Sequence, residues 1–161
     1  DIDEKKIKSA VSSFQGVKRR FEYVLKNNRH ILIDDYAHHP EELRALITSA
    51  KELYPGKKCT IVFQPHLYSR TRDLADGFAE VLAIADEVIL LPIYPARELP
   101  VEGVNSEMIL NKMDKQQKMV LSKTSLLELL KKNETELLIT AGAGDIDLLL
   151  AEIKSILVNN N

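Results

Sequence analysis

The stretch ILIDDYAHHPEE (residues 31–42) holds most of the side chains in this sequence that could do chemistry. Its acids could hold hydroxyl groups, the ring of Tyr36 could stack on a base, and the imidazoles of His38 and His39 could donate or accept hydrogen bonds. The first three residues are typical of a buried strand. The proline and glutamates at the end are typical of the first turn of a helix. A strand that delivers polar groups to its carboxyl end before a helix is how open α/β sheets build ligand sites.

Three later apolar runs are also followed by polar or turn-forming residues. The segments are QPHLYSRTRD after CTIVF, PIYPARELP after EVILL, and AGAGD after ELLIT. The carboxyl ends of parallel strands meet at one edge of a sheet. Four segments are therefore expected to face a common crevice: residues 34–39, 64–70, 92–98 and 141–145. Within it, Arg70 and Arg72 could bind a carboxylate or a phosphate, or else pair with nearby aspartates on the surface.

Hydrophobic periodicity predicts helices that alternate with short strands along the chain. Helices are expected over residues 3–14, 40–54, 72–85, 105–113, 124–132 and from 146 onward. Strands are expected over residues 30–34, 59–63, 87–91, 119–121 and 136–140, with a β-hairpin over 19–34. The predicted fold class is α/β, a Rossmann-like three-layer α/β/α arrangement with a mostly parallel sheet and an antiparallel edge hairpin. Residues 1–161 are expected to form a single domain.

Two of the predicted helices have further features. The first has an apolar face formed by Ile7, Ala10, Val11 and Phe14. In the helix over 124–132, Ser125 and Glu128 fit a capping box at its start.

The composition is ordinary for a soluble globular protein, with 161 residues of which 45% are hydrophobic and 29% charged. A net charge of −2 gives no electrostatic footprint for nucleic acid or a membrane surface. No apolar run approaches the ~20 residues that cross a bilayer, and no signal peptide is visible, so a cytoplasmic location is expected. Cys59 lies in an apolar run and is expected to be a buried structural thiol. The chain starts at Asp1 and could be a domain cut from a longer protein.

Some patterns allow two interpretations. Arg19 and Arg20 could face a phosphate, but a solvated edge that blocks strand pairing is the favoured interpretation. The AGAGD turn could bind an anion or simply be a tight strand-to-helix turn, with neither preferred. A metal site at His38 and His39 is disfavoured, because adjacent residues point in different directions and no third ligand lies at zinc-like spacing. There is no G-x-x-x-x-G-K-[ST] motif, so a triphosphate cradle is missing from the chain.

Five ordered motifs resemble those of the C-terminal domain of the Mur ligases. They are FQGVKRRFE (14–22), DDYAHHPEE (34–42), VFQPHLYSRTRDL (62–74), LPIYPARELP (91–100) and ITAGAGDI (139–146). The resemblance covers about residues 7–157. The double histidine and the Gln-Pro-His block resemble the family member that adds L-alanine to UDP-N-acetylmuramate more than the members that act later in the pathway.

The resemblance implies an ATP-dependent amide-bond ligase of peptidoglycan precursor synthesis with three domains. One domain holds the UDP-sugar, a central P-loop domain is the ATPase, and this chain is the third. ATP would phosphorylate the lactyl carboxylate of UDP-N-acetylmuramate, and the amine of L-alanine would attack the acyl phosphate. ATP and Mg²⁺ would belong to the full-length enzyme, with the metal held by the central domain and neither bound by this domain alone. This domain would close over ATP and help to bind the amino acid, and by itself it would be inactive.

Matching positions carry the family's roles onto this chain. The segment that contacts the nucleoside of ATP in the family is matched by Asp35, Tyr36, His38 and His39. The block that approaches L-alanine and the acyl phosphate is matched by His66 and Arg70, which are the candidate catalytic residues. Arg70 would also be the clamp for the carboxylate of the amino acid.

The YxxGE loop of the family is matched by Tyr94, Ala96 and Glu98, and Tyr94 and Glu98 are candidate substrate-binding residues. There are two departures from the family pattern. Leu67 stands where the family usually has arginine, and Arg97 stands where it usually has glycine. The first removes a cation from the amino-acid side, and Arg97 could compensate for it.

Other functions are compatible with the same residues. The nearest is the murein recycling ligase, which attaches a tripeptide to the same UDP-sugar. A different class is a stand-alone Rossmann-like module that binds a nucleotide or regulates a partner, which the missing P-loop would also fit. A last alternative is a folded domain whose polar strand ends are inert.

Overall fold

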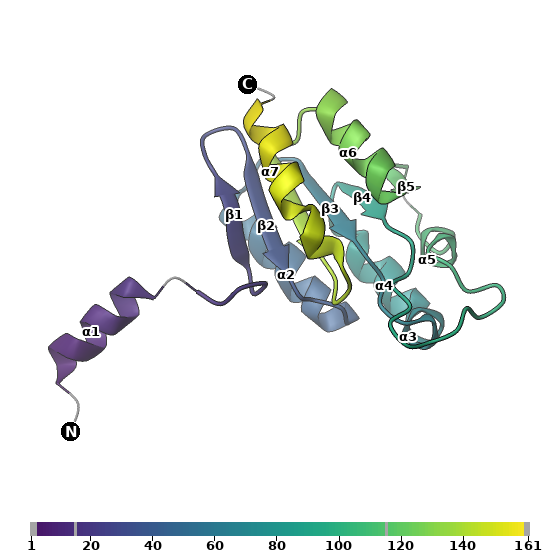
Figure 1. Ribbon diagram of the computed structural model, residues 1–161, viewed down its shortest axis with the longest axis horizontal. Helices are drawn as coiled ribbons and strands as arrows, with labels where there is room; N and C mark the ends of the chain where they lie inside the picture. The colour runs from purple at the N-terminus through teal and green to yellow at the C-terminus, as the bar shows by residue number, and fades with distance from the viewer. Residues whose placement is uncertain (1–2, 15, 115, 160–161) are drawn as a thin grey trace.

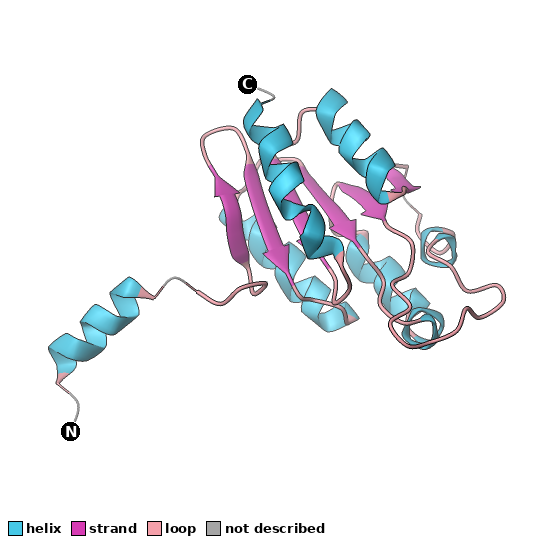
Figure 2. Cartoon of the chain, viewed as in Figure 1, coloured by secondary structure: helices cyan, strands magenta, loops and turns pink. Residues whose placement is uncertain are grey.

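A six-stranded sheet lies at the centre of the computed structural model, which describes residues 3–14, 16–114 and 116–159 (Figure 1, Figure 2). The strand order is β1-β2-β6-β3-β4-β5, and each neighbouring pair is parallel except β1 and β2, which are antiparallel. The strands are β1 Glu22–Lys26, β2 Ile31–Asp35, β3 Cys59–Phe63, β4 Glu87–Leu90, β5 Lys118–Val120 and β6 Leu137–Ala141. The predicted α/β fold, with a mostly parallel sheet and an antiparallel edge hairpin, is confirmed.

Two layers of helices cover the sheet, with α2 and α4 on one face and α6 and α7 on the other (Figure 1). The helices are α1 Glu4–Ser13, α2 Pro40–Leu53, α3 Tyr68–Asp73, α4 Ala75–Leu82, α5 Glu107–Leu110, α6 Lys123–Lys132, the 3₁₀ turn η1 Ile146–Leu149 and α7 Leu150–Asn159. Within the described residues, no helix has the length and apolar character needed to cross a membrane.

Alternation along the strands divides the core between the two faces, because successive side chains of a strand point in opposite directions. One cluster holds Ile33 and Ile61 with the apolar sides of α2 and α4. The other holds Leu32 and Val62 with those of α6 and α7. Each of these four side chains is fully buried, which stabilises the fold by about 1.5–3 kcal/mol apiece. Cys59 is buried in β3, as predicted.

The last strand of the chain, β6, is inserted between β2 and β3. In the register of the sheet, Ala141 is paired with Asp35 on one side and with Phe63 on the other. The carboxyl ends of three parallel strands therefore lie side by side. This places the loops that follow β2, β3 and β6 next to one another at a single edge of the sheet.

The prediction of one helix over residues 72–85 is wrong. The structure has two helices here, α3 from Tyr68 and α4 from Ala75, and they are separated by Leu74 at φ −115°. The early start has a long-range cause, because the carboxylate of Glu98 accepts hydrogen bonds from the backbone N–H and hydroxyl of Ser69. Free N–H groups in the first turn of a helix are often satisfied in this way.

Other predicted boundaries shift by a few residues. The start of α6 is capped by Ser122, whose hydroxyl accepts a hydrogen bond of 3.0 Å from the N–H of Ser125, so the capping box at Ser125 is wrong. The edge strand begins at Glu22 rather than at 19, since residues 17–20 form a turn. The helix predicted over 105–113 is only four residues long, and the last helix begins with the 3₁₀ turn η1.

The first helix, α1, projects away from the sheet (Figure 1). Its predicted apolar side chains Ile7 and Val11 are 47% and 71% exposed, and none of its residues is buried. The helical periodicity is confirmed, but the sheet contributes no surface that covers this apolar face.

Candidate functional site

Three loops meet at the carboxyl edge of the sheet. His66 follows β3 and Tyr94 follows β4, and the backbone joins their loops: the N–H of Leu67 donates to the carbonyl of Tyr94 at 2.9 Å, and the N–H of Tyr94 donates to that of Pro65 at 2.8 Å. From the loop after β2, the ring of His38 lies 6.2 Å from the ring of His66. The expectation that these polar segments gather at one edge is therefore confirmed.

Asp35 holds the loop that follows β2 in place. Its carboxylate accepts hydrogen bonds of 2.7 Å from the backbone N–H groups of Phe21 and Ala37. A carboxylate has about four lone-pair sites, so two remain for a ligand. Asp35 thus ties the turn before β1 to the turn that carries Tyr36.

Tyr36 presents a partly exposed aromatic ring with cations beside it. The ring is 36% exposed. The guanidinium carbon of Arg19 lies 5.1 Å from the ring centroid and that of Arg20 lies 5.9 Å away, distances typical of cation–π contact. The ring of His38 lies edge-on at 5.3 Å. An aromatic platform flanked by cations suits a ligand with a flat ring and a negative charge.

The two histidines occupy different positions. His38 donates from Nδ1 to the carbonyl of Tyr36 at 2.9 Å, which orients its ring. His39 is exposed at the N-cap of α2. Burial alone would raise the pKa of the Glu42 carboxyl, but hydrogen bonds from the backbone N–H groups of both histidines outweigh it and lower that pKa. Glu42 therefore anchors the His38 loop to the first turn of α2.

His66, Arg70 and Tyr94 form a connected group. The rings of His66 and Tyr94 are stacked with centroids 5.8 Å apart and an angle of 17°. Arg70 donates from its guanidinium to Nδ1 of His66 at 3.3 Å. Burial lowers the pKa of the His66 imidazole, and the Arg70 cation lowers it further, so this ring is neutral at pH 7. The group presents a cation held by a neutral imidazole, which is suited to binding a carboxylate.

The backbone between these residues is unusual at Leu67. This residue has φ +73° and ψ 136°, a conformation that side chains other than glycine rarely adopt. It is the N-cap of α3, so the helix that carries Arg70 begins there. Glu98 accepts from Ser69 in the next turn, and these hydrogen bonds lower the pKa of its carboxyl. Glu98 thereby fastens the loop after β4 to the start of α3.

Of the two departures from the family pattern, only Leu67 has an unusual backbone. Arg97 is exposed in the loop after β4. The left-handed backbone position in that loop is Ala96, at φ +50°, and not Arg97. The arginine in place of glycine is therefore accommodated without backbone strain at its own position.

The favoured interpretation of Arg19 from the sequence is wrong. It was expected at a solvated edge, but its side chain is only 19% exposed and pairs with the fully buried Asp34 at 3.2 Å. Its guanidinium also donates to the backbone carbonyls of Gly142 and Gly144. Arg20, by contrast, is exposed beside Tyr36.

The AGAGD turn packs closely against the loops around it. A Cβ at Gly142 would come within 2.7 Å of the carbonyl oxygen of Gln64, and one at Gly144 within 2.7 Å of the Tyr94 side chain. The following η1 turn is only four residues long. Close packing therefore accounts for both glycines, which favours the tight-turn interpretation.

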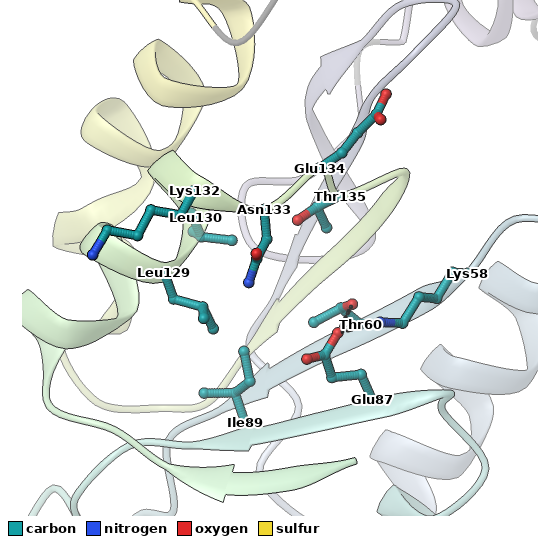
Figure 3. A pocket seen from close by; sticks show the side chains of 10 residues that line it. All are labelled: Lys58, Thr60, Glu87, Ile89, Leu129, Leu130, Lys132, Asn133, Glu134 and Thr135. Atoms are coloured by element: carbon teal, nitrogen blue, oxygen red, sulfur yellow. Dashed lines mark hydrogen bonds and ion pairs between the residues drawn. The ribbon is translucent and has the colours of Figure 1, made fainter.

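A cavity of about 390 Å³ lies elsewhere, at the amino ends of β3 and β4 beside the end of α6 (Figure 3). Lys58 and Glu87 form an ion pair of 2.8 Å in it, and the hydroxyl of Thr60 donates to Glu87 at 3.1 Å. Two of its charged residues, Lys58 and Glu87, are thus paired with each other. None of the residues predicted to do chemistry lines this cavity.

Sequence reasoning missed two contributors to the edge. One is the pair of Arg19 and Asp34, whose members are 15 residues apart in the chain. The other is Lys123, which pairs with Asp145 at 2.6 Å, while Asp145 also accepts from Gln64 at 2.9 Å. A buried acid at the end of a strand was the only signal in the sequence that a cation must lie nearby.

Comparison with known proteins places the chain among ligases. The model of the family described as Mur ligase, glutamate ligase domain, matches residues 19–151. The UDP-N-acetylmuramate–L-alanine ligase of Cytophaga hutchinsonii is 54% identical over 148 residues, which cover 92% of this chain and 32% of that protein. The protein of the same name from Flavobacterium johnsoniae is 49% identical over 154 residues, or 96% of this chain and 34% of that protein. The chain spans about a third of the length of the curated relatives it matches.

Solved structures agree with the match to these ligases. The crystal structure of UDP-N-acetylmuramate-alanine ligase from Thermotoga maritima has a TM-score of 0.76 and 29% identity, covering 99% of this chain and 34% of that one. A murein peptide ligase from Psychrobacter arcticus has a TM-score of 0.70, covering 94% of this chain and 32% of that one. At 19% identity, the second likeness concerns the fold alone.

Proposed function

Because this chain belongs to the Mur ligase family as its glutamate ligase domain, we propose that it is the C-terminal domain of an ATP-dependent ligase that joins L-alanine to UDP-N-acetylmuramate in peptidoglycan precursor synthesis. The observation that carries the proposal is the identity of 54% and 49% with two proteins named for that reaction. The chain spans about a third of those proteins, and we assign the UDP-sugar site and the P-loop ATPase to other domains of the same enzyme.

The edge after β2 fits an adenine nucleotide. Tyr36 offers a half-open ring on which a base could stack, and the exposed Arg20 beside it offers a cation for a phosphate. Asp35 keeps two lone-pair sites that could accept from ribose hydroxyls. His38 and His39 complete the nucleotide-facing segment. We assign these residues to nucleotide binding when this domain closes over ATP held mainly by the P-loop domain.

The edge after β3 fits the amino acid. Arg70 is the only one of the α3 arginines that is held by His66, and its guanidinium can fork the carboxylate of L-alanine. His66 is neutral, so it positions Arg70 without adding charge, and because Nδ1 accepts from Arg70 its Nε2–H remains to donate to the ligand. Tyr94 stacks on His66, and Glu98 holds the loop that carries Tyr94, which makes both part of the amino-acid side.

The metal ion that phosphoryl transfer requires is assigned to another part of the enzyme. In the described residues, no three of His, Cys, Asp and Glu lie close enough together to hold a metal ion. We assign the Mg²⁺ that would neutralise charge on the phosphoryl group to the P-loop domain. The contribution of this chain is to bind, to orient and, on closure, to exclude water from the activated carboxylate. The reaction consumes ATP and soluble substrates, so we expect it in the cytoplasm, with no nucleic-acid or membrane partner.

The test is phosphate release by the full-length enzyme. With ATP, Mg²⁺ and UDP-N-acetylmuramate present, adding L-alanine should start continuous phosphate release, and omitting the UDP-sugar should abolish it. The isolated chain under the same conditions should release none, because most phosphate contacts are elsewhere. Rapid ATP- and alanine-dependent release by the isolated chain would refute the division of labour, and silence of the full-length enzyme would refute the reaction.

A further inference from the structure

Arg19 joins three separate parts of the carboxyl edge. Its Nε contacts Asp34 at the end of β2, and its terminal nitrogens donate to the carbonyls of Gly142 and Gly144 in the turn after β6. A terminal nitrogen also lies 3.6 Å from the carboxylate of Asp147 in η1. The planar guanidinium has five N–H donors in a fixed fork, so one side chain can hold all these acceptors at once.

The same residue is in contact with Tyr36 through both its side chain and its backbone. The guanidinium carbon lies 5.1 Å from the centroid of the Tyr36 ring. The backbone N–H of Tyr36 donates to the carbonyl of Arg19 at 2.8 Å. Arg19 itself has φ +56°, and its N–H donates to the carboxylate of Glu22 at 2.8 Å. The left-handed turn thus directs both the carbonyl and the guanidinium of Arg19 toward Tyr36.

Asp34 makes this arrangement rigid. Its side chain is fully buried, and burial raises the pKa of its carboxyl against the lowering effects of the Thr140 hydroxyl and the Arg19 guanidinium. Thr140 donates to one oxygen at 2.7 Å and Arg19 to the other. A buried carboxylate with fixed partners cannot move without leaving a charge unpaired, so Arg19 is confined to one position.

We propose that Arg19 is a positioning residue that locks the Tyr36 ring to the turn at residues 142–144 and thereby presents the ring to the adenine nucleotide. The proposal rests on the proposed function, because it takes Tyr36 to be the platform for the nucleotide. Arg19 is mostly buried and acts through Tyr36, whereas the exposed Arg20 is the cation available to the ligand. The loops that hold the amino acid follow other strands, β3 and β4, whereas the side chain of Arg19 makes its polar contacts with β2, the turn at residues 142–144 and η1.

The variant Arg19→Lys in the full-length enzyme separates positioning from charge. A lysine keeps a cation beside Asp34. Its compact ammonium lacks the planar fork with which the guanidinium reaches Asp34 and two carbonyls at once. We expect the Kd for the non-hydrolysable analogue AMP-PNP, measured by calorimetry, to rise five- to twentyfold, with a matching rise in KM for ATP. The KM for L-alanine should stay within twofold. Arg44→Lys is the matched control, since Arg44 also pairs with two carboxylates but lies on the exposed side of α2.

A second variant covers the possibility that Arg19→Lys folds poorly. Arg19→Met combined with Asp34→Asn removes the buried cation and anion together, so no charge is left unpaired. This double variant should also bind AMP-PNP at least fivefold more weakly while keeping its KM for L-alanine. Unchanged AMP-PNP affinity in either folded variant would overturn the positioning role, and so would equal rises in both KM values. If the unmodified enzyme neither binds AMP-PNP nor releases phosphate, it is the proposed function that fails.

Discussion

Arg70 donates to Nδ1 of His66 at 3.3 Å, so the cation on α3 is held by a neutral imidazole at the end of β3. The contact joins Arg70 within α3 to a residue that lies just before the N-cap of that helix. The candidate amino-acid site is therefore a preorganised pair of side chains rather than a single flexible arginine.

Removing the cation should weaken amino-acid binding selectively. We expect Arg70→Ala in the full-length enzyme to raise the KM for L-alanine by roughly ten- to hundredfold, because a charge-assisted hydrogen bond contributes about 1.5–3 kcal/mol. The KM for UDP-N-acetylmuramate should change by less than about twofold. Arg72→Ala is the control, since Arg72 is exposed and pairs with its neighbour Asp73. Equal effects of Arg70→Ala on both substrates would exclude the clamp role.

The neutral state of His66 predicts a pH dependence. Burial and Arg70 lower the pKa of His66 below its usual 6.5, so the unfolded chain takes up a proton at a higher pH than the folded one. The stability that the neutral ring contributes is complete above pH 6.5 and is lost as the pH falls toward the lowered pKa. The KM for L-alanine should rise over the same range, because a protonated ring can no longer accept from Arg70.

The variant His66→Gln checks this assignment, since glutamine can accept from Arg70 but does not titrate. Its KM for L-alanine should be nearly flat as the pH falls below 6.5 toward the lowered pKa of His66, whereas that of the unmodified enzyme rises. A variant that keeps the full rise on acidification would show that another group is responsible.

The backbone conformation of Leu67 predicts that a glycine variant at this position is more stable than an alanine variant, the reverse of the usual order. At φ +73° a side chain costs about 1–3 kcal/mol, whereas glycine adopts this region freely. We therefore expect Leu67→Gly to be more stable than Leu67→Ala by about 1 kcal/mol in urea unfolding. At the exposed helical position Glu128 the order should be the usual one, with alanine more stable than glycine by about 1 kcal/mol. Alanine more stable than glycine at position 67 would mean that the residue does not have this conformation in solution.

Gly144 packs closely against Tyr94, one of the two stacked rings. A Cβ there would lie 2.5 Å from Oε1 of Gln64 and 2.7 Å from Cβ of Tyr94, so Gly144→Ala must displace Tyr94. Overpacking of this kind costs about 1–3 kcal/mol, and we expect the KM for L-alanine to rise with it. Gly56→Ala is the control, because it has φ +85° but open space around its Cβ. It should lose about 1 kcal/mol of stability without any change in KM, and an equal KM effect at both positions would contradict the account.

The fold class followed from periodicity because the buried strands β2, β3 and β6 are continuous apolar runs and each is followed by turn residues. The position of β6 between β2 and β3 did not follow, since strand order depends on pairing between segments far apart in the chain. The start of α3 was missed for the same reason: Glu98, which satisfies its first turn, is 29 residues away from Ser69.

The residues of the candidate site could be predicted from the sequence, but the contacts between them could not. Polar strand ends identified His66, Arg70 and Tyr94 because parallel strands share an edge. Arg19 was misjudged because two adjacent arginines in a polar stretch resemble a solvated edge. Its acceptor Gly142 lies 123 residues further along the chain, and only folding brings the two together.

The choice of acceptor is the most direct test of the account. The full-length enzyme is supplied with ATP, Mg²⁺ and UDP-N-acetylmuramate, and kcat/KM for phosphate release is compared for L-alanine, glycine, L-serine and the tripeptide of murein recycling. The account predicts the highest kcat/KM with L-alanine. A preference for the tripeptide would contradict it and assign the chain to the recycling ligase, with Leu67 then a candidate for part of a wider pocket.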